Sequence, residues 1–325
     1  MLGGRSNPFK TPILFALFKD PETTLKVFDA IRKEKPQKLY ISADGPRLDV
    51  PGEREECELT RSILSKIDWT CDVKTKFSDV NLGIKKGTSS AISWFFENED
   101  EGIILEHDDL PTRSFFPFCE TLLERHRENK RIMHIGGSNL MFGQNCGNGS
   151  YYYSRIAQTW GFATWKDRWK LWDGEIKDFP DFRDGNYINN YFFSTFAKEF
   201  WNDKFQEIYE GHNSTTWAFP WIFALMIRDA VSITPNVNLV SNIGFNPKAV
   251  HSRDLKHKYN NVPRHEMEEL IDPPFIIPDV TADEFMVRDM AWEPFPRILR
   301  KKVRKHLKKT LPDTTYQTLK KMIKI

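Results

Sequence analysis

IILEHDDL, residues 103–110, joins three apolar residues directly to a histidine and three acidic residues. The apolar run predicts a short strand buried on both faces, and charged side chains next to a core are costly unless something compensates them. Alternate side chains of an extended segment share a face, so Glu106 and Asp108 point one way and His107 and Asp109 the other. Two carboxylates on one side of a strand end suit a hard divalent cation. A solvated turn after the strand is the alternative interpretation.

Strands and helices alternate on both sides of this segment. Apolar runs predict strands over 12–18, 39–41, 71–77, 103–105 and 132–135, and helical periodicity predicts helices over 21–33, 53–67, 88–97 and 114–128. This alternation with short connections predicts an α/β fold, with a mostly parallel sheet flanked by helices on both faces. Such sheets bind ligands beyond the carboxyl ends of their strands, where polar residues follow three strands here: Asp44 and Arg47, Glu106 and Asp108, Ser138 and Asn139.

The sequence changes character after Gly147, where tyrosines and tryptophans accumulate. We expect a helical, aromatic-rich half that runs on to Trp221, with a helix over 216–228 and then a strand over 237–240. Beyond residue 253 proline and charge dominate and periodicity is weak. We therefore expect one domain over 1–252, with halves over 8–140 and 150–252, and a C-terminal extension over 253–325 that ends in a basic amphipathic tail.

The overall composition is that of a folded protein without a disulfide framework. Of the 325 residues, 40% are hydrophobic, which is enough for a sizeable core. The four cysteines show no C-x-x-C spacing, so a reducing compartment is the default. The apolar run 12–18 is too short for a signal peptide, and no run approaches the ~20 residues of a membrane-spanning helix. We therefore expect a cytoplasmic protein.

The charge is concentrated at one end of the chain. Residues 297–325 contain eleven Lys and Arg against one Asp, a local net charge of +10, whereas the remainder, with 36 basic and 44 acidic residues, carries −8. A solvated helix and an amphipathic helix on an anionic surface, such as the inner face of a membrane, are both open for this tail. Nucleic acid is not an expected partner, because the basic residues are confined to the tail and the body is acidic.

Five segments in order resemble a bacterial family of GT-A-fold glycosyltransferases that use nucleotide-diphospho-sugars: LYISADGPR (39–47), NLGIKKGTSSAISWFF (81–96), IILEHDDLPTRSFF (103–116), WGFATWKDRWKLW (160–172) and NVNLVSNIGF (236–245). They are similar, more distantly, to the N-acetylglucosaminyltransferase that begins complex N-glycan synthesis. The resemblance covers about residues 12–252. It implies a GT-A (Rossmann-like) fold and a Mn²⁺- or Mg²⁺-dependent hexosyl- or N-acetylhexosaminyltransferase. The donor would be a nucleotide-diphospho-sugar, UDP-linked, and the acceptor a surface polysaccharide or lipid-linked glycan.

The resemblance also implies the residues of the donor side, 8–140. Asp44 matches an acidic residue that contacts the nucleotide base, Asp108 matches the direct metal ligand, and Glu106 lies nearer the ribose or a metal-bound water. His251 matches a late histidine that binds the metal or the diphosphate, with a polar loop histidine as the alternative. The expected donor-binding set is completed by Arg47, Asn81, Lys85 and Lys86. The two lysines could face the diphosphate, with a solvated surface as the alternative.

Ala218 departs from the pattern of the family. The matching position carries an acidic residue, which in an inverting enzyme serves as general base on the acceptor hydroxyl. Another carboxylate could supply the base, the mechanism could retain configuration, or the chain could be inactive. The carboxylates nearby in sequence are Asp173, Asp184 and Asp229.

Aromatic residues are the candidates for acceptor binding in the half over 150–252. Most tryptophans there are expected in the core, since aromatics at helical spacing usually pack together. The candidates for contact with the acceptor are Tyr153, Arg155, Trp160 and Trp217. Two other functions stay open: a sugar nucleotidyltransferase, which would use a nucleoside triphosphate, and a glycan-binding protein without turnover.

Overall fold

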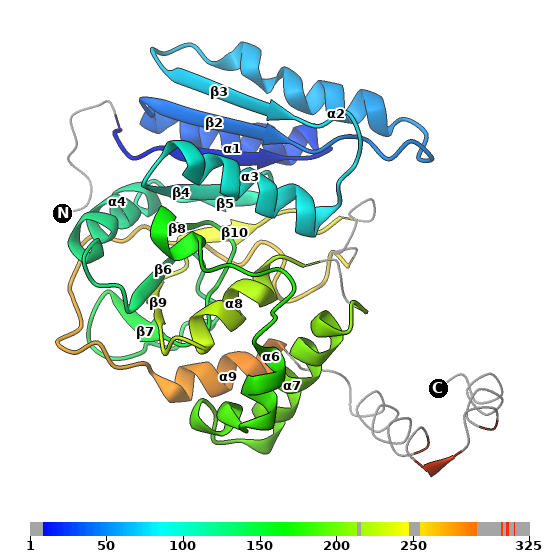
Figure 1. The fold of residues 1–325 in the computed structure, drawn as a ribbon. Coiled ribbons are helices and arrows are strands. Elements are labelled where there is room, and N and C mark those ends of the chain that lie inside the picture. The colour runs from blue at the N-terminus through cyan, green and yellow to red at the C-terminus, as the bar shows by residue number, and fades with distance from the viewer. Residues whose placement is uncertain are drawn as a thin grey trace. The chain divides into compact units, whose positions relative to one another are not determined.

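The computed structural model describes residues 9–212, 216–246 and 254–290, together with Leu307, Thr310, Leu311 and Thr315 (Figure 1). The chain divides into two compact units, Met1–Phe285 and Met286–Ile325. Everything below concerns the first unit. His251 and most of the basic tail lie outside the described residues. No helix within the described ranges is both long enough and apolar enough to cross a bilayer.

One eight-stranded sheet forms the centre of the first unit, in the order β3-β2-β1-β4-β8-β6-β9-β7 (Figure 1). Its strands are β1 (Ile13–Leu17), β2 (Lys38–Ala43), β3 (Asp72–Phe77), β4 (Glu101–Glu106), β6 (Ile132–Gly136), β7 (Tyr151–Ser154), β8 (Phe162–Trp165) and β9 (Val231–Pro235). β8 is antiparallel to both of its neighbours and β7 is antiparallel to β9, while all other pairs are parallel. The predicted α/β fold with a mostly parallel sheet is confirmed.

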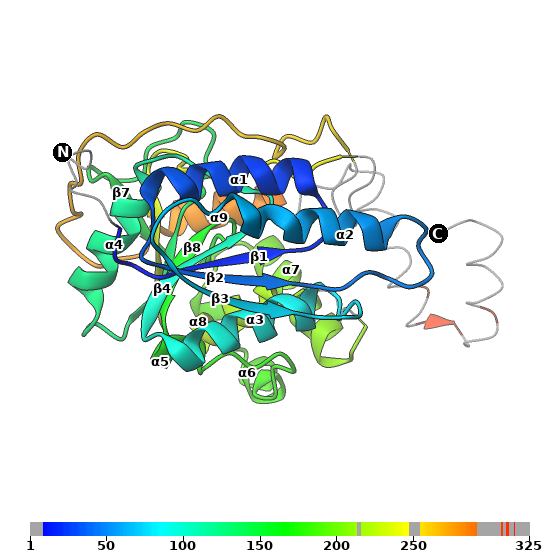
Figure 2. The ribbon, with the colours of Figure 1, turned by 90° about the horizontal axis from the view of Figure 1, so that it is seen from above.

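Helices cover both faces of this sheet (Figure 2). One face carries α1 (Pro21–Glu34), α2 (Glu53–Arg61) with the short 3₁₀ helix η1 (Ser62–Lys66), and α4 (Phe115–His126); the other carries α3 (Ile84–Asn98) and α8 (Ala218–Met226). Val27, Phe28 and Ile31 recur at helical spacing and so form one apolar stripe along α1. This stripe faces the sheet, where the three side chains share the core with Phe15 of β1. On the other face Phe95 of α3 meets Tyr40 at 5.0 Å.

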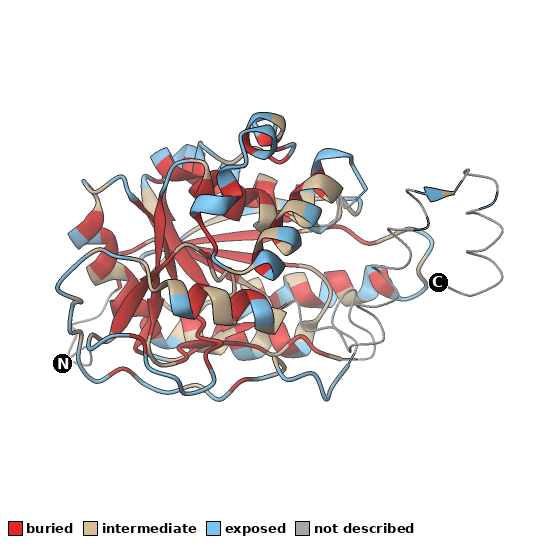
Figure 3. Cartoon of the chain, turned by 90° about the horizontal axis from the view of Figure 1, so that it is seen from below, coloured by how far each residue is buried: buried red, intermediate tan, exposed pale blue. Residues whose placement is uncertain are grey.

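The strands of the sheet are largely buried, except for the edge strand β3, whose residues are half-buried or exposed (Figure 3). β1, β6, β7, β8 and β9 contain only buried residues, which is why they read as continuous apolar or aromatic runs rather than alternating ones. The side chain of Asp20 accepts a hydrogen bond from the Thr23 amide at 3.0 Å, so it caps α1 as predicted. The buried strands therefore provide a well-packed base for the side chains at the carboxyl edge of the sheet.

The aromatic half contributes strands as well as helices. Its helices are α5 (Lys166–Trp169), α6 (Phe179–Asp184), the 3₁₀ helix η2 (Tyr187–Asn190), α7 (Thr195–Tyr209) and α8, so the predicted aromatic-rich helical region is confirmed. Two strands that the sequence analysis did not single out, β7 and β8, precede these helices and enter the sheet. Runs of Tyr and Phe suit buried strands as well as helices, and sheet pairing decides between them.

The strand predicted over 237–240 is also wrong in its position. The chain forms β9 at Val231–Pro235 and then β10 at Val240–Asn242, which pairs antiparallel with β5 (Asp109–Pro111) in a separate two-stranded sheet. Between them, Asn238 accepts a hydrogen bond from the Asn139 amide at 2.9 Å, so this stretch links two loops instead of forming a ladder. The β5–β10 pair sets Asn242 directly opposite Asp109.

The last described element, α9 (Val280–Met290), is tied back to the body by two acidic residues. Asp283 accepts from the hydroxyl of Ser154 at 2.5 Å and from the Arg155 amide at 3.1 Å. Glu284 accepts from the amide of Ser194 at 3.0 Å, just before α7 begins. Burial raises the pKa of Asp283 to about 7, although the hydrogen bond from Ser154 opposes this shift.

Candidate active site

Three carboxylates stand together at the carboxyl end of β4, in the middle of the sheet. Glu106 and Asp108 are half-buried and Asp109 is only 1% exposed. Glu106 accepts a hydrogen bond from the indole Nε1 of Trp217 at 3.3 Å, and Asp108 accepts from the amide Nδ2 of Asn242 at 3.0 Å. Within the described ranges no Lys, Arg or His forms an ion pair with any of the three. Their negative charge is therefore uncompensated by this part of the chain.

Asp109 is held by the backbone around it. Its Oδ2 accepts from the amide of Glu106 at 3.1 Å and from the amide of Gly161 at 2.9 Å, while its buried Oδ1 has no hydrogen-bond partner among the described residues. Burial, followed by the charges of Asp108 and Glu106, raises the pKa of Asp109 well above its usual range. Asp109 thus ties the turn after β4 to Gly161, the residue that precedes β8.

The carboxylates at the end of β4 form a set of oxygen donors that a divalent cation could bind. Burial and the neighbouring charge of Asp108 raise the pKa of Glu106 well above its usual range, despite the hydrogen bond from Trp217. Close carboxylates with an unpartnered buried oxygen among them are an oxygen donor set that suits Mg²⁺ or Mn²⁺. No group of three His, Cys, Asp or Glu with metal-binding geometry occurs in the part of the chain that is described. Glu106 and Asp108 would therefore share such an ion with water or substrate oxygens.

Trp217 is positioned by a stack of three rings. Phe162 of β8 stacks on Trp217 at 5.6 Å and on His134 of β6 at 4.8 Å. Nδ1 of His134 accepts from the indole of Trp221 at 3.1 Å, so Nε2 carries the proton and donates to the Gln158 carbonyl at 2.9 Å. Burial lowers the pKa of His134 to about 4, which keeps the ring neutral. Sequence analysis did not single out His134, whose signal was a histidine inside an apolar strand.

The start of α3 connects to Trp217 through Trp172. The indole of Trp172 donates to the Trp217 carbonyl at 3.0 Å. Lys85 lies beside Gly174, since a Cβ added to Gly174 would be 3.2 Å from Cε of Lys85. No side chain caps α3, and its first turn contains Lys85 and Lys86 but no acidic residue. Positive side chains at a helix N-terminus add to the positive end of the helix dipole, so a bound anion would be favoured at this end of α3. Lys85 forms an ion pair with Glu175 at 3.0 Å.

Asp44 is fully occupied by groups of the protein. Its two oxygens accept four hydrogen bonds, from the amides of Gly45, Leu82 and Gly83 and from the side chain of Asn81, at 2.8–3.2 Å. A carboxylate offers about four acceptor positions, so no further donor is accommodated without a rearrangement. Asp44 and Asn81 clamp the loop before α3 to the end of β2. They fix the position of the loop from which α3 begins.

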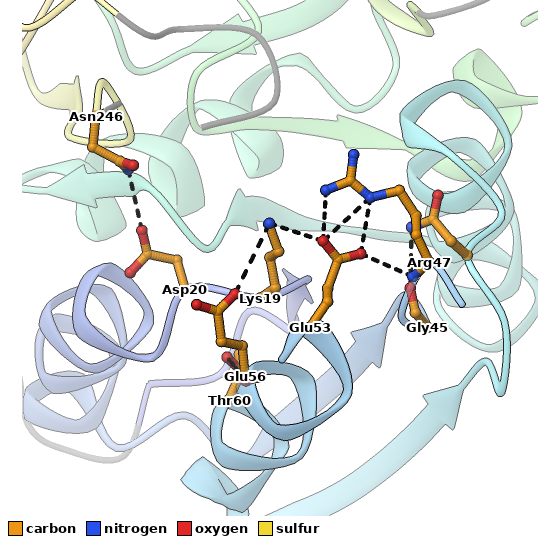
Figure 4. A network of polar contacts seen from close by, with 9 residues as sticks. Lys19, Asp20, Gly45, Arg47, Glu53, Glu56, Thr60 and Asn246 are labelled. Atoms are coloured by element: carbon orange, nitrogen blue, oxygen red, sulfur yellow. Dashed lines mark hydrogen bonds and ion pairs between the residues drawn. The ribbon is translucent and has the colours of Figure 1, made fainter. Parts of the chain in front are cut away.

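Arg47 is likewise engaged inside the protein (Figure 4). It surrounds the carboxylate of Glu53 with its backbone amide at 2.8 Å, its Nε at 2.9 Å and its guanidinium Nη2 at 2.5 Å. Lys19 contacts the same carboxylate at 2.8 Å. Nearby, Asn246 reaches Asp20 at 3.4 Å, which joins the loop after β10 to the start of α1 (Figure 4).

The four predicted acceptor residues fall into two groups. Trp217 and Trp160 lie by the carboxylates, since Trp160 precedes Gly161, whose amide binds Asp109. Tyr153 and Arg155 belong to the end of β7, four strand spacings and so about 19 Å across the sheet from β4. There Tyr153 is a core residue, and Arg155 donates to the Tyr191 carbonyl at 2.9 Å. The structure does not bring this second group together with Glu106.

The residues considered for the general base also separate. Ala218 begins α8 directly after Trp217, whose indole donates to Glu106. Asp173 accepts hydrogen bonds from the amides of Glu175 and Lys177 and so closes its own turn, one residue after Trp172. Asp184 pairs with Arg183 on the surface. Asp229 lines a cavity of about 630 Å³ at the far end of α8.

Comparison with known proteins places the fold only distantly. No protein-family model and no curated protein matches the sequence. Among solved structures, HddC from Yersinia pseudotuberculosis aligns with a TM-score of 0.30 and 9% identity over 48% of this chain and 77% of its own. The inositol-1-phosphate CTP transferase from T. maritima aligns with a TM-score of 0.30 and 12% identity over 50% of this chain and 73% of its own. A UDP-glucose pyrophosphorylase complexed with UDP-glucose aligns with a TM-score of 0.29 and 8% identity over 49% of this chain and 78% of its own.

Proposed function

We propose that this protein is a metal-dependent glycosyltransferase that transfers a sugar from a UDP-sugar to a surface polysaccharide or lipid-linked glycan. One observation carries the proposal. Glu106, Asp108 and Asp109 are clustered and partly buried at the end of the central strand, and no basic residue of the described ranges compensates them. Such an arrangement favours a partner that neutralises it: protons do so in the free protein, as the raised pKa values of Glu106 and Asp109 indicate, and a bound cation would take their place. The carboxyl edge of a mostly parallel sheet is also where ligands of this fold class bind.

The roles of the residues follow from their surroundings. Glu106 and Asp108 would hold Mn²⁺ or Mg²⁺ by carboxylate oxygens, and Trp217 fixes Glu106 through its indole donor. The bound cation would neutralise the charge that develops on the leaving diphosphate. The uncapped start of α3, with Lys86 in its first turn, offers backbone N–H groups to the phosphates. Asp44 and Asn81 hold that helix start in place.

Nucleotidyl transfer, from a nucleoside triphosphate to a sugar phosphate, is the second candidate. A TM-score of 0.30 supports neither function. The charges at the sheet edge favour a diphosphate over a triphosphate: Lys19 and Arg47 are bound to Glu53, and Lys85 is bound to Glu175. The start of α1 is already capped by a carboxylate, so it offers no second phosphate site.

A thermal-shift screen separates the two candidates. The protein is melted with UDP-glucose, UDP-galactose, UDP-N-acetylglucosamine, UDP-N-acetylgalactosamine or UTP, each with and without Mn²⁺. A ligand at 100 times its Kd stabilises the folded state by about 2.7 kcal/mol. We expect stabilisation by at least one UDP-sugar that depends on Mn²⁺ and is lost in Asp108→Asn. Stabilisation by UTP alone, with pyrophosphate released from UTP and a sugar phosphate, would establish the nucleotidyltransferase instead.

A further inference from the structure

Five aromatic rings from three separate loops contact one another beside the carboxylates. We call this cluster the aromatic platform; its members are Phe142, Trp160, Phe245, His257 and Tyr259. Phe245 is buried at 7% exposure and lies at its base, Trp160 and Tyr259 are half-buried, and Phe142 and His257 are exposed. The platform is thus a surface with aromatic faces rather than an extension of the core.

The rings form a closed set of contacts. Trp160 meets Phe245 at 6.3 Å and Tyr259 at 6.0 Å, both edge to face. His257 stacks on Phe245 at 5.2 Å and contacts Tyr259 at 5.1 Å. Phe142 lies parallel to Tyr259, with 5° between the planes and 6.1 Å between the centroids. Each ring is therefore oriented by at least one neighbour, and the set is preorganised for a flat partner.

Phe142 occupies its place at the cost of backbone strain. Its φ is +50°, and that of Gly143 is +87°. A bulky residue in the left-handed region is an outlier, and such strain concentrates where function requires it. The usual compensation would be burial of the ring, yet Phe142 is 45% exposed. The strained turn presents an aromatic side chain to solvent instead of hiding it.

Two glycines join the platform to the carboxylates. Gly161 follows Trp160, and its amide donates to Oδ2 of Asp109 at 2.9 Å. Gly244 precedes Phe245 and lies so close to Asp108 that an added Cβ would be 2.1 Å from Oδ2. The platform therefore adjoins the Asp108 side of the cluster. The basic start of α3 connects to the opposite side, through Trp172, Trp217 and Glu106.

We infer that the aromatic platform binds the acceptor glycan, with Phe142 and Tyr259 stacking on a pyranose ring; this inference rests on the proposed glycosyl transfer. Ligand sites combine aromatic walls with a few polar groups that fix orientation. His257 supplies one, because its Nδ1 accepts from the Tyr259 amide at 3.2 Å and its Nε2–H points elsewhere. The donor phosphates are expected at the α3 side, which leaves the platform to the acceptor.

The test measures glycan binding and donor binding separately on the full chain. The probe for the platform is an array of soluble oligosaccharides of neutral hexoses and N-acetylhexosamines. The probe for the donor side is the melting temperature with UDP and Mn²⁺. We compare Tyr259→Ala and Phe142→Gly with the wild type. Tyr209→Ala is the matched control, since Tyr209 is also 45% exposed but lies at the end of α7.

We expect at least tenfold weaker glycan binding in both platform variants, unchanged glycan binding in Tyr209→Ala, and an unchanged shift with UDP and Mn²⁺ in all three. Glycine relieves the strain at position 142, so Phe142→Gly should melt no lower than the wild type while it loses glycan affinity; a purely structural ring would give the reverse. Absence of wild-type glycan binding, or loss of the UDP shift in the platform variants, overturns the inference. Glycan binding without any UDP and Mn²⁺ shift overturns glycosyl transfer but leaves the platform standing.

Discussion

Glu53 and Glu106 lie at the same edge of one sheet, yet their charges are treated in opposite ways. The side chain of Glu53 is fully buried, and Lys19 and Arg47 contact it at 2.8 Å and 2.5 Å. Burial alone would raise the pKa of Glu53, but hydrogen bonds from Arg47 and Lys19 lower it to about 2. Glu106 has no such partners among the described residues, and burial together with Asp108 raises its pKa.

The difference distinguishes a structural charge from a functional one. Around Glu53 every charge is balanced by another part of the protein, so the network is complete by itself. Around Glu106 the chain places three carboxylates together, and the donors that the described residues supply to them are neutral, namely Trp217, Asn242 and backbone amides. A buried group whose charge is uncompensated by the fold is a candidate for binding something that compensates it. Four predictions on three substitutions break or sharpen this comparison.

Asp108→Asn should have the largest effect. It removes one of the two expected cation ligands, and loss of electrostatic stabilisation of this kind lowers turnover by about a thousandfold. The readout is Mn²⁺-dependent release of UDP from a UDP-sugar. Asp100→Asn, at the exposed other end of β4, is the control and should leave turnover unchanged. Undiminished activity in Asp108→Asn would remove the metal assignment.

Glu53→Gln should act on stability instead of activity. It leaves Lys19 and Arg47 without their shared carboxylate, and removing one member of a buried ion pair costs about 3 kcal/mol of unfolding free energy. Urea unfolding at pH 7 measures the change. Glu58→Gln, on the exposed side of the same helix α2, should stay within about 0.5 kcal/mol of the wild type. Equal effects of the two substitutions would show that the network around Glu53 stabilises nothing.

The advantage of the wild type over Glu53→Gln should depend on pH. A carboxylate whose folded pKa is lowered contributes stability above its unfolded pKa and loses it as the pH falls through the folded value. With a folded pKa of about 2 for Glu53, the difference between the two proteins should be constant above about pH 5 and shrink progressively toward pH 2. Urea midpoints at pH 7, 5, 4 and 3 follow it. A difference that grows on acidification contradicts this assignment.

Lys86→Ala should have the smallest effect. Lys86 is exposed and forms no ion pair within the described ranges, so it is available to the diphosphate in a way that Lys85, bound to Glu175, is not. One surface charge near a phosphate is worth about 1 kcal/mol, which corresponds to roughly fivefold weaker UDP binding. Titration calorimetry with UDP and Mn²⁺ measures it, with Lys66→Ala on η1 as control. Equal affinities for the two variants would exclude Lys86 from the donor site.

The first half of the fold could be predicted from local signals. Apolar runs marked β1, β2, β4 and β6, and the pair Asp20-Pro21 marked the start of α1. The second half could not, because β8 owes its position to two strands that are distant in sequence. Its residues, Phe-Ala-Thr-Trp, pack equally well on a helix or a strand, so only the pairing decides.

The same limit applies to the site. The cluster after β4 was visible because acidic residues follow an apolar run. Asp44 and Arg47 matched a motif, but their partners are backbone amides near residue 82 and the carboxylate of Glu53, which carry no recognisable spacing. The platform was missed, except for Trp160, because its rings come from loops about 20 to 85 residues apart.

The position of β8 has a consequence for synthesis of the chain. β8 is the only link between β4 and β6 in the sheet order, so the middle of the sheet stays open until residue 165 has been made. At about 5–20 residues per second, the edge of β4 waits several seconds after its own translation. In a ribosome-bound or truncated chain that ends near residue 140, β4 has one unpaired edge and β6 lacks both of its partners, β8 and β9, which favours self-association. Until β8 pairs with β4 and β6, we therefore expect a chaperone or the ribosome surface to be needed to keep these strand edges from pairing with other chains.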